Sequence, residues 1–331
     1  MKILVVGLGS MGKRRVRNLT RLGVSGLVGY DPREDRRKEA ENKYGIETIG
    51  DWHEVEAMPA DAWIISTPPD THIDYGLKAA RLGIHFFCEA NVTDPRATEM
   101  IETLKASGTV GAPSCTMRYY FGPKKIKELI KSGAIGKPWL FTYQTGQYLP
   151  DWHPWESYKD FYVSKRETGA CREIVPFELA WLTDIFGEVG TLTGLKDKVS
   201  DLDADIDDVY QLLMRFKDGI SGHLLVDVVA RPAVRKFRVN GSEGTIEWDH
   251  TANTVMLWTA KAGTWEQFNL ASGTVEAGYI HAEEPYVLEM ADFLAAVKGE
   301  HPWPYSFSDD EEVLELLVQA ERSNETGRHQ P

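Results

Sequence analysis

The sequence predicts an α/β protein: an N-terminal doubly wound parallel sheet, followed by an α+β domain with an open, largely antiparallel sheet. Three observations support this prediction. Short apolar strands alternate with helices through the first third of the chain. A glycine-rich turn joins the first strand to the first helix. Beyond this part, strand-like runs are separated by glycine and asparagine turns. We therefore expect one domain at residues 1–118 and a second at residues 119–331.

The first stretch of the chain sets the pattern. Residues 2–6 are apolar and rich in β-branched side chains, which indicates a buried strand. The strand breaks into Gly-Leu-Gly-Ser-Met-Gly at residues 7–12, a G-x-G-x-x-G motif. Residues 13–22 have apolar side chains at helical spacing, and a second strand over 27–30 ends at Asp31. Strand, glycine turn, helix and strand-end acid together predict a dinucleotide-binding (Rossmann) unit.

Each glycine of the motif has a physical role in binding a dinucleotide. Gly7 permits the tight turn, Gly9 lets a pyrophosphate approach the backbone, and Gly12 allows the helix to pack closely on the strand. Ser10 and Met11 lie at the helix N-terminus, where amide groups and the helix dipole attract phosphate. The alternative is a glycine-rich turn of another α/β protein, which the flanking elements make much less favourable.

Asp31 determines which cofactor we expect. It follows the third glycine by about 20 residues, where an acid accepts hydrogen bonds from the hydroxyls of an adenosine ribose. A carboxylate here favours NAD over NADP, since it would repel a 2′-phosphate. Arg33, Arg36 and Arg37 lie close by in sequence and leave NADP possible.

The rest of the first domain alternates in the same way. Parallel sheets bind ligands at the carboxyl ends of their strands, so the loops that follow the strands at 62–66 and 84–88 are expected to join the glycine turn in one crevice. The helices are expected at 32–44, 73–82 and 95–107, with further strands at 46–49 and 110–115. The cofactor-binding candidates in these loops are Thr67, Pro68, His72, Glu89 and Ala90. For His72 the alternative is a local hydrogen bond at the helix start.

In the second domain we expect a helix at 123–132, a strand at 139–145 and a helix at 169–186. An antiparallel meander follows over 209–270, with turns near Gly219, Gly244, Asn253 and Gly263. Helices are expected at 285–298 and 308–324. Between strand and helix, residues 147–168 form a long aromatic segment without periodicity, which is typical of a functional loop.

Composition excludes several classes of partner. The net charge of −13 opposes binding to nucleic acid or to an anionic membrane. Arg14, Arg15 and Arg17 form a local basic patch, which we interpret as solvating a helix face or touching cofactor phosphates. The sequence contains no apolar run of about 18 residues that would span a membrane. Its three cysteines lie far apart and suit a reducing, cytoplasmic location. The spacing of His, Cys and Asp does not predict a metal site.

Several motifs together resemble the Gfo/Idh/MocA family of glucose–fructose oxidoreductase, inositol dehydrogenase and rhizopine catabolism proteins. They are GLGSMGKRRVRNL at 7–19, STPPDTH at 66–72, FFCEA at 86–90, MRYYFGP at 117–123, GAIGKP at 133–138 and VNGSEGTIEW at 239–248. The resemblance implies an NAD(P)-dependent oxidoreductase of a sugar, cyclitol or sugar derivative. It also implies that nicotinamide and substrate meet between the domains, and that the open sheet packs against another subunit in a homodimer or homotetramer.

The sequence departs from this family at two positions that handle protons. Members usually carry Glu-Lys-Pro after the strand at 84–88, but Ala90 occupies the Lys position here. They also carry Asp-x-x-x-His after Gly-Gly, where this chain has Glu173 and Phe177. Oxidation of an alcohol requires an acceptor for its proton. The catalytic candidates are therefore Glu173, His153 and Lys165.

Other residues are candidates for holding the substrate. Arg172 could clamp an anionic group and Trp152 could stack on a sugar ring. Arg118, Tyr158 and Tyr162 complete the set of substrate-binding candidates. The alternatives are ordinary structural roles: a helix N-terminal carboxylate for Glu173, a solvated side chain for Arg172, and a packed loop residue for His153.

Two functional classes stay open at this point. The first is an NAD-dependent dehydrogenase, or an enzyme that uses NAD transiently in epimerisation or glycoside cleavage. The second is a dinucleotide-binding sensor or partner subunit without catalysis. The loss of Lys and His favours the second class, whereas Glu173 and the polar aromatic segment favour the first.

Overall fold

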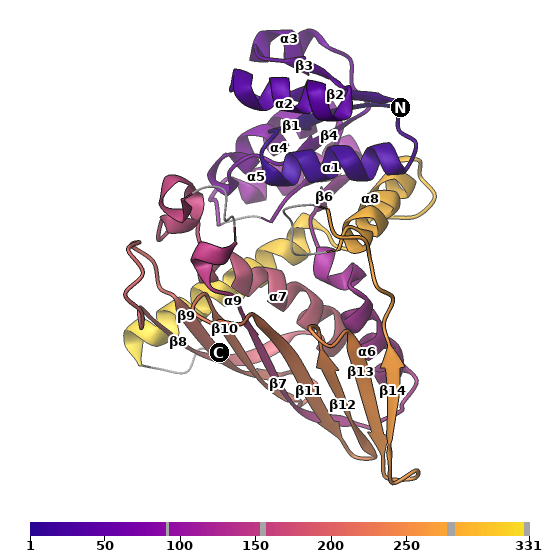
Figure 1. Ribbon diagram of the computed structural model, residues 1–331, viewed down its shortest axis with the longest axis vertical. Helices are drawn as coiled ribbons and strands as arrows, with labels where there is room; N and C mark the ends of the chain where they lie inside the picture. The colour runs from indigo at the N-terminus through magenta and orange to yellow at the C-terminus, as the bar shows by residue number, and fades with distance from the viewer. Residues whose placement is uncertain (91–92, 153–156, 277–281, 328–331) are drawn as a thin grey trace. The chain divides into compact units, whose positions relative to one another are not determined.

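The computed structural model describes residues 1–90, 93–152, 157–276 and 282–327 (Figure 1). The chain forms two compact units: Met1–Thr116 with Gly273–Glu312, and Met117–Ser272 with Val313–Pro331. Sequence analysis placed residues 273–312 in the second domain. By their contacts they belong to the first unit, because their helix packs on the first helix of the chain.

The first unit is built on a six-stranded parallel sheet with the strand order β3-β2-β1-β4-β5-β6, which confirms the predicted doubly wound fold. Alternate side chains explain why both faces are covered. Ile3 and Val5 point into one apolar cluster, whereas Leu4 and Val6 point into another. The strands are β1 (Lys2–Val6), β2 (Gly26–Tyr30), β3 (Glu47–Ile49), β4 (Ala62–Ile65), β5 (His85–Cys88) and β6 (Gly111–Pro113).

Helices cover the two faces of this sheet. The cluster on one face includes side chains of α1 (Ser10–Arg21), α2 (Glu34–Tyr44) and α8 (Glu284–Val297). The cluster on the other face includes side chains of α4 (His72–Leu82) and α5 (Ala97–Ser107). A further helix, α3 (Trp52–Ala57), was not predicted; it is short, and the Asp51 carboxylate caps it by accepting from the amide of His53.

The second unit is built on an eight-stranded sheet with the order β14-β13-β12-β11-β7-β10-β9-β8. The predicted meander over 209–270 is wrong at its centre, because β7 lies between β10 and β11 and runs parallel to β10. The turns on either side are as expected. The strand β8 was not predicted. The strands are β7 (Pro138–Gly146), β8 (Val189–Asp197), β9 (Val209–Phe216), β10 (Ser221–Asp227), β11 (Val234–Gly241), β12 (Gly244–Asp249), β13 (Thr254–Thr259) and β14 (Trp265–Asn269).

Helices pack on one face of this sheet. The helix α7 (Cys171–Phe186) contacts β9 and β10, and α6 (Phe121–Lys131) contacts β12 and β13 (Figure 1). The last helix, α9 (Phe307–Thr326), approaches β8 so closely that a Cβ at Gly194 would lie 2.4 Å from the carbonyl oxygen of Ala320. The opposite face of the sheet exposes apolar side chains, which are Leu140, Leu195 and Leu213.

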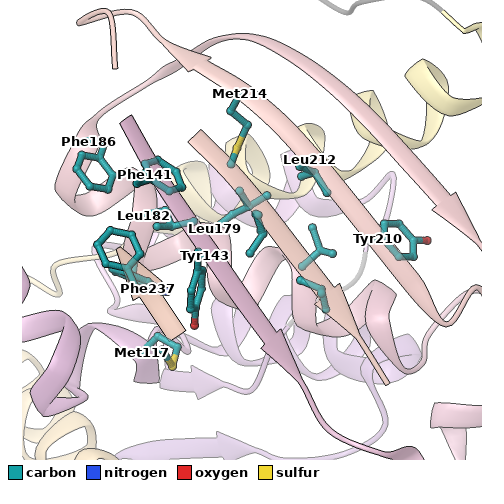
Figure 2. Packing of buried hydrophobic residues seen from close by; sticks show 14 of the residues in the cluster. Met117, Phe141, Tyr143, Leu179, Leu182, Phe186, Tyr210, Leu212, Met214 and Phe237 are labelled. Carbon is teal, nitrogen blue, oxygen red and sulfur yellow. The ribbon is translucent and has the colours of Figure 1, made fainter. Parts of the chain in front are cut away.

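Aromatic rings fill the centre of this core. Phe141 is fully buried and stacks on Phe186 and Phe237, with ring centroids 5.0 and 5.6 Å away (Figure 2). Gly222 on the neighbouring strand makes room, since a Cβ there would lie 2.1 Å from the Phe141 ring. The packing of helix on sheet in this unit therefore depends on one phenylalanine cluster.

We expect Phe141→Ala to lower the free energy of unfolding by about 3–5 kcal/mol, because it leaves a cavity among rings that cannot close in. Val199, which is 63% exposed in the same unit, provides the control. Val199→Ala should change the free energy by less than about 0.5 kcal/mol. Urea unfolding followed by circular dichroism measures both; equal stability of the two variants would contradict the assigned core.

Candidate functional site

The glycine turn of the first unit has the shape that a dinucleotide requires. Gly7 has a φ of +92°, and a Cβ on it would lie 2.6 Å from the carbonyl oxygen of Ser66. A Cβ on Gly12 would lie 1.8 Å from the carbonyl oxygen of Gly7, so only glycine lets α1 approach β1. A Cβ on Gly9 would meet nothing closer than the Arg36 guanidinium at 3.6 Å. The backbone at Gly9 is thus open to a pyrophosphate.

The start of α1 favours an anion. Gly9 is the N-cap and offers no side-chain acceptor, and within Ser10–Arg21, which the structure describes in full, the first turn carries no acidic side chain. The amides of Ser10, Met11 and Gly12 therefore stand at the positive end of the helix dipole without a competing carboxylate. These residues fit the diphosphate of a dinucleotide.

Asp31 lies at the end of β2 and is only 2% exposed. Its Oδ2 accepts from the amide of Leu8 at 2.9 Å, and its Oδ1 accepts from the amide of Arg33 at 2.9 Å. These bonds fix the carboxylate beside the glycine turn, where the motif predicts the adenosine ribose. A carboxylate oxygen can accept more than one hydrogen bond, so both oxygens keep capacity for ribose hydroxyls.

The three arginines after Asp31 differ in what they contact. Arg33 pairs with Asp35, and Arg37 donates to the backbone carbonyls of Asp31 and Pro32. Arg36 is the one that faces the glycine turn, with its Nη1 3.6 Å from Oδ2 of Asp31. It is therefore the residue through which a 2′-phosphate could be tolerated.

The loop after β4 is held by its own side chains. His72 is buried, and its Nε2 lies 2.8 Å from the carbonyl oxygen of Thr67. Because a carbonyl only accepts, this nitrogen carries the proton in that bond. Thr71 donates to the Thr67 hydroxyl at 2.8 Å. The local hydrogen bond expected as the alternative for His72 is present, and the roles of Thr67, Pro68 and His72 toward a cofactor stay predictions.

Sequence analysis did not anticipate the ionic network of this unit. Arg14, Arg15 and Arg17 were interpreted as a solvated patch or as phosphate ligands, but Arg15 is fully buried. Its guanidinium donates to both oxygens of Glu89, at 2.6 and 2.9 Å, and its Nη1 lies 2.9 Å from Oε2 of Glu289. We call Arg15, Glu89 and Glu289 the Arg15 cluster. A usable signal existed: Arg15 lies four residues before Leu19, on the apolar side of the helix.

Each member of the Arg15 cluster connects to further structure. Glu89 also accepts from the hydroxyl of Ser66 at 3.2 Å. Glu289 accepts from the amide of Cys115 at 2.8 Å and from the hydroxyl of Thr116 at 2.7 Å. The cluster therefore links α1, the ends of β4 and β5, α8 and the chain that leaves β6.

The charges of the cluster influence one another. Burial alone would lower the pKa of Arg15, but Glu89 and Glu289 raise it well above its usual value, so the guanidinium stays charged. Burial raises the pKa of Glu289, with Arg15 opposing that shift and Glu89 adding to it. Both oxygens of Glu289 nevertheless face obligate donors, the Cys115 amide and the Arg15 guanidinium, which favours the ionised form.

The second unit brings together two of the predicted site residues. Tyr162 donates from its hydroxyl to Oε1 of Glu173 at 2.9 Å. Glu173 lies in the first turn of α7, which follows Ala170, a non-glycine residue with a φ of +53°. One turn later the partly buried ring of Phe177 packs against the core.

The two predicted arginines contact acidic groups of the protein itself. Arg172 is mostly buried and donates to both oxygens of Glu321, at 2.8 and 3.2 Å. Tyr210 also donates to Glu321, and burial together with this carboxylate raises the pKa of Tyr210. Arg118 donates to the carbonyl oxygen of Ala180 in α7 at 3.0 Å. These contacts are structural, and a role toward substrate stays a prediction for both arginines.

The aromatic segment is held by ion pairs and short turns. Lys159 pairs with Asp203, and Arg166 pairs with Asp205 and Asp207 at 2.7 and 3.0 Å. Lys165 has an exposed side chain. The indole of Trp152 donates to the carbonyl oxygen of Gln147, and Tyr158 packs against the core. The predicted His153 lies outside the described residues.

Residues 1–112 match a family model described as an oxidoreductase family with an NAD-binding Rossmann fold. Residues 124–247 match the Gfo/Idh/MocA C-terminal domain. The chain belongs to the Gfo/Idh/MocA oxidoreductase family. This confirms the resemblance found in the motifs and identifies the first unit as an NAD-binding domain.

Related proteins of the Gfo/Idh/MocA family cover the whole chain. A myo-inositol 2-dehydrogenase of Thermotoga maritima is 26% identical over 99% of this chain and 97% of its own. A scyllo-inositol 2-dehydrogenase (NAD⁺) of Bacillus subtilis is 32% identical over 42% of each chain. In fold, an Agrobacterium radiobacter oxidoreductase solved with NAD⁺, L-tartaric acid and magnesium is similar over 99% of this chain and 97% of its own, with a TM-score of 0.86 at 17% identity. A levoglucosan dehydrogenase solved with NADH is similar over 100% and 98%, with a TM-score of 0.85 at 19% identity.

Two further findings concern the described part of the chain. None of its helices is both long and apolar enough to cross a membrane. Among the same residues, no three His, Cys, Asp or Glu side chains are grouped so that they could hold a metal ion.

The contacts of Asp31 and the arginines lead to a test of cofactor choice. We expect Asp31→Ala to narrow the preference for NADH over NADPH, because it removes the carboxylate that repels a 2′-phosphate. Arg36→Ala should widen the preference by about tenfold, since it removes the cation beside that position. Arg33→Ala, which breaks the pair with Asp35, is the control and should leave the ratio unchanged. Fluorescence titration with each reduced cofactor measures the ratio; tighter binding of NADPH by the wild type would refute the assignment.

Proposed function

We propose that this protein is an NAD-dependent dehydrogenase that interconverts a secondary alcohol and a ketone on a cyclitol or sugar derivative. The observation that carries the proposal is the glycine turn with Asp31, because it fits a dinucleotide and leaves the 2′-position beside a carboxylate. The substrate class follows from the full-length likeness to a myo-inositol 2-dehydrogenase. NADP stays possible through Arg36.

The residues of the first unit would hold the cofactor at the glycine turn and at the ends of the strands. The amides at Gly9 to Gly12 would bind the diphosphate, and Asp31 the adenosine ribose. The nicotinamide would then lie at the carboxyl ends of β4 and β5, near Thr67, Pro68, Glu89 and Ala90. When bound, NAD⁺ supplies an acceptor for the hydride that leaves the alcohol carbon.

The second unit would supply the acceptor for the hydroxyl proton. Glu173 is the candidate that the family resemblance suggests for this role, and Tyr162 donates to it at 2.9 Å. In the direction of oxidation, the substrate hydroxyl would give its proton to Glu173, and the carbon that bears this hydroxyl would lose a hydride. Tyr162 orients the carboxylate so that one oxygen faces the substrate. Lys165 and His153 remain further candidates for proton transfer, with Arg118, Trp152, Tyr158 and Arg172 around the substrate.

The first experiment is a turnover screen. Wild-type protein with NAD⁺ is incubated with a panel of inositols, sugars and sugar acids, and with NADH for the corresponding ketones. Formation or loss of NADH is followed at its absorbance band, and products by NMR. Conversion of a cyclitol or sugar supports the proposal. Tight NADH binding without any conversion would instead favour a non-catalytic sensor or partner subunit, and a product of unchanged oxidation state would favour transient use of NAD.

On a converted substrate, we expect Glu173→Gln to lower kcat by about a hundredfold or more, the usual scale for loss of a general base. NADH binding should not change. Glu167→Gln removes an exposed carboxylate shortly before α7 and should keep full activity. Tyr162→Phe, which leaves Glu173 in place, should cost less than Glu173→Gln. Unchanged turnover in Glu173→Gln would remove Glu173 from the mechanism. Adding the family side chains with Ala90→Lys and Phe177→His should alter substrate preference.

Assembly belongs to the same proposal. The face of the second sheet opposite α6 and α7 exposes Leu140, Leu195 and Leu213, and Leu213 is 58% exposed at the centre of β9. An apolar sheet face of this kind is suited to burial against a second copy, in a homodimer or a homotetramer of two such pairs.

We expect light scattering at micromolar concentration to give a dimer or tetramer. Leu213→Arg should shift the protein from this assembly to smaller species, because the substitution places a charge on the face that the two copies bury. The control is Leu82→Arg, which changes an exposed leucine of α4 in the first unit and should not affect assembly. A wild-type monomer at this concentration would contradict the interface.

The cellular location is also part of the proposal. Cys88, Cys115 and Cys171 are all buried thiols, as suits a reducing compartment. Together with the use of a soluble cofactor, this supports a cytoplasmic enzyme.

A further inference from the structure

The Arg15 cluster places two carboxylates on one guanidinium. The Nε and Nη2 atoms of Arg15 donate to the two oxygens of Glu89, and its Nη1 lies 2.9 Å from an oxygen of Glu289. The cluster is fully buried at Arg15 and Glu289, whereas the Glu89 side chain is 13% exposed. With Glu289 ionised, as its obligate donors favour, the cluster carries one net negative charge. Within the cluster, the Glu89 carboxylate is the group that solvent can reach.

Glu89 lies at the edge of the parallel sheet where a ligand is expected to bind. Glu89 follows β5 directly and contacts Ser66, which follows β4. Both strands end at the edge of the parallel sheet where ligands bind. The next residue is Ala90, whose side chain is uncharged. It therefore does not offset the negative charge of Glu89.

We propose that Glu89, held by Arg15, makes this site select the oxidised cofactor over the reduced one. The inference rests on the proposed function, which puts the nicotinamide end at this edge. The nicotinamide ring of NAD⁺ is a cation and that of NADH is neutral, so a fixed carboxylate close to the ring stabilises only the oxidised form. Arg15 is a positioning residue here, since it touches Glu89 and fixes its carboxylate against movement.

Calorimetric titration of three ligands tests the proposal without turnover. The ligands are NAD⁺, NADH and ADP-ribose, which lacks the nicotinamide. Wild-type protein should bind NAD⁺ at least as tightly as NADH. Glu89→Gln should weaken NAD⁺ by about tenfold, as expected for one charge several ångströms away in a partly solvated site. NADH should change by less than about twofold and ADP-ribose should not change. Glu89→Asp keeps the charge and should restore most of the NAD⁺ affinity.

A matched control separates this effect from loss of stability. Glu283 accepts from Arg14, Arg17 and Asn18 on the same helix and is 10% exposed, close to the 13% of Glu89. Glu283→Gln should lower the melting temperature by about as much as Glu89→Gln does, and it should leave the ratio of NAD⁺ affinity to NADH affinity unchanged. A Glu89→Gln variant with an unchanged ratio, or with ADP-ribose weakened equally, would overturn the inference.

The outcome remains decisive if Glu89→Gln does not fold. In that case the wild-type ratio decides, because NADH binding tenfold or more tightly than NAD⁺ would refute selection of the oxidised form. Failure of all three ligands to bind would instead reject the proposed function.

Discussion

The first unit depends on a guanidinium that has no access to water. A buried cation is costly unless it is paired, and Arg15 is paired with two carboxylates from separate parts of the chain, through hydrogen bonds to Glu89 and an ion pair with Glu289. The ring of Phe87 lies 4.5 Å from its central carbon and adds a cation–π contact. Removal of either acid would leave a buried charge poorly compensated. The arrangement of α1, the β5 end and α8 is therefore specified together, by a single side chain on the helix that receives the cofactor.

The parallel sheet could be predicted from the sequence because its information is local. The strands β1, β4 and β5 are short, mostly apolar runs, and the glycine turn and Asp31 are recognised from their spacing alone. The order of the second sheet could not be predicted in the same way. Nothing local to β7 says that it inserts between β10 and β11, since strand pairing there depends on which edges remain after the hairpins have formed. The short helix α3 and the strand β8 carry too little periodicity to be distinguished from loops.

The candidate site shows the same division. The resemblance to the family suggested Glu173 as a candidate. Its contact with Tyr162 joins two residues only 11 positions apart. The partner of Arg172 was beyond sequence reasoning, because Glu321 lies 149 residues away on the last helix. The environment of Arg14, Arg15 and Arg17 could not be predicted either. Arg14 and Arg17 pair with Glu283, and Arg15 pairs with Glu89 and Glu289, so the acidic partners of all three lie far away in the sequence.

The return of residues 273–312 to the first unit has a consequence for how the protein is made. Met290, Phe293 and Leu294 of α8 cover apolar side chains of β1 and α1, and Glu289 completes the pairing of Arg15. During synthesis these residues leave the ribosome only after the entire second sheet has done so. The N-terminal sheet must therefore wait with one face only partly covered, by α1 and α2, while the following unit folds, which exposes it to aggregation and to chaperones. A fragment that ends at Thr116 would lack α8, and we expect it to be insoluble when expressed alone.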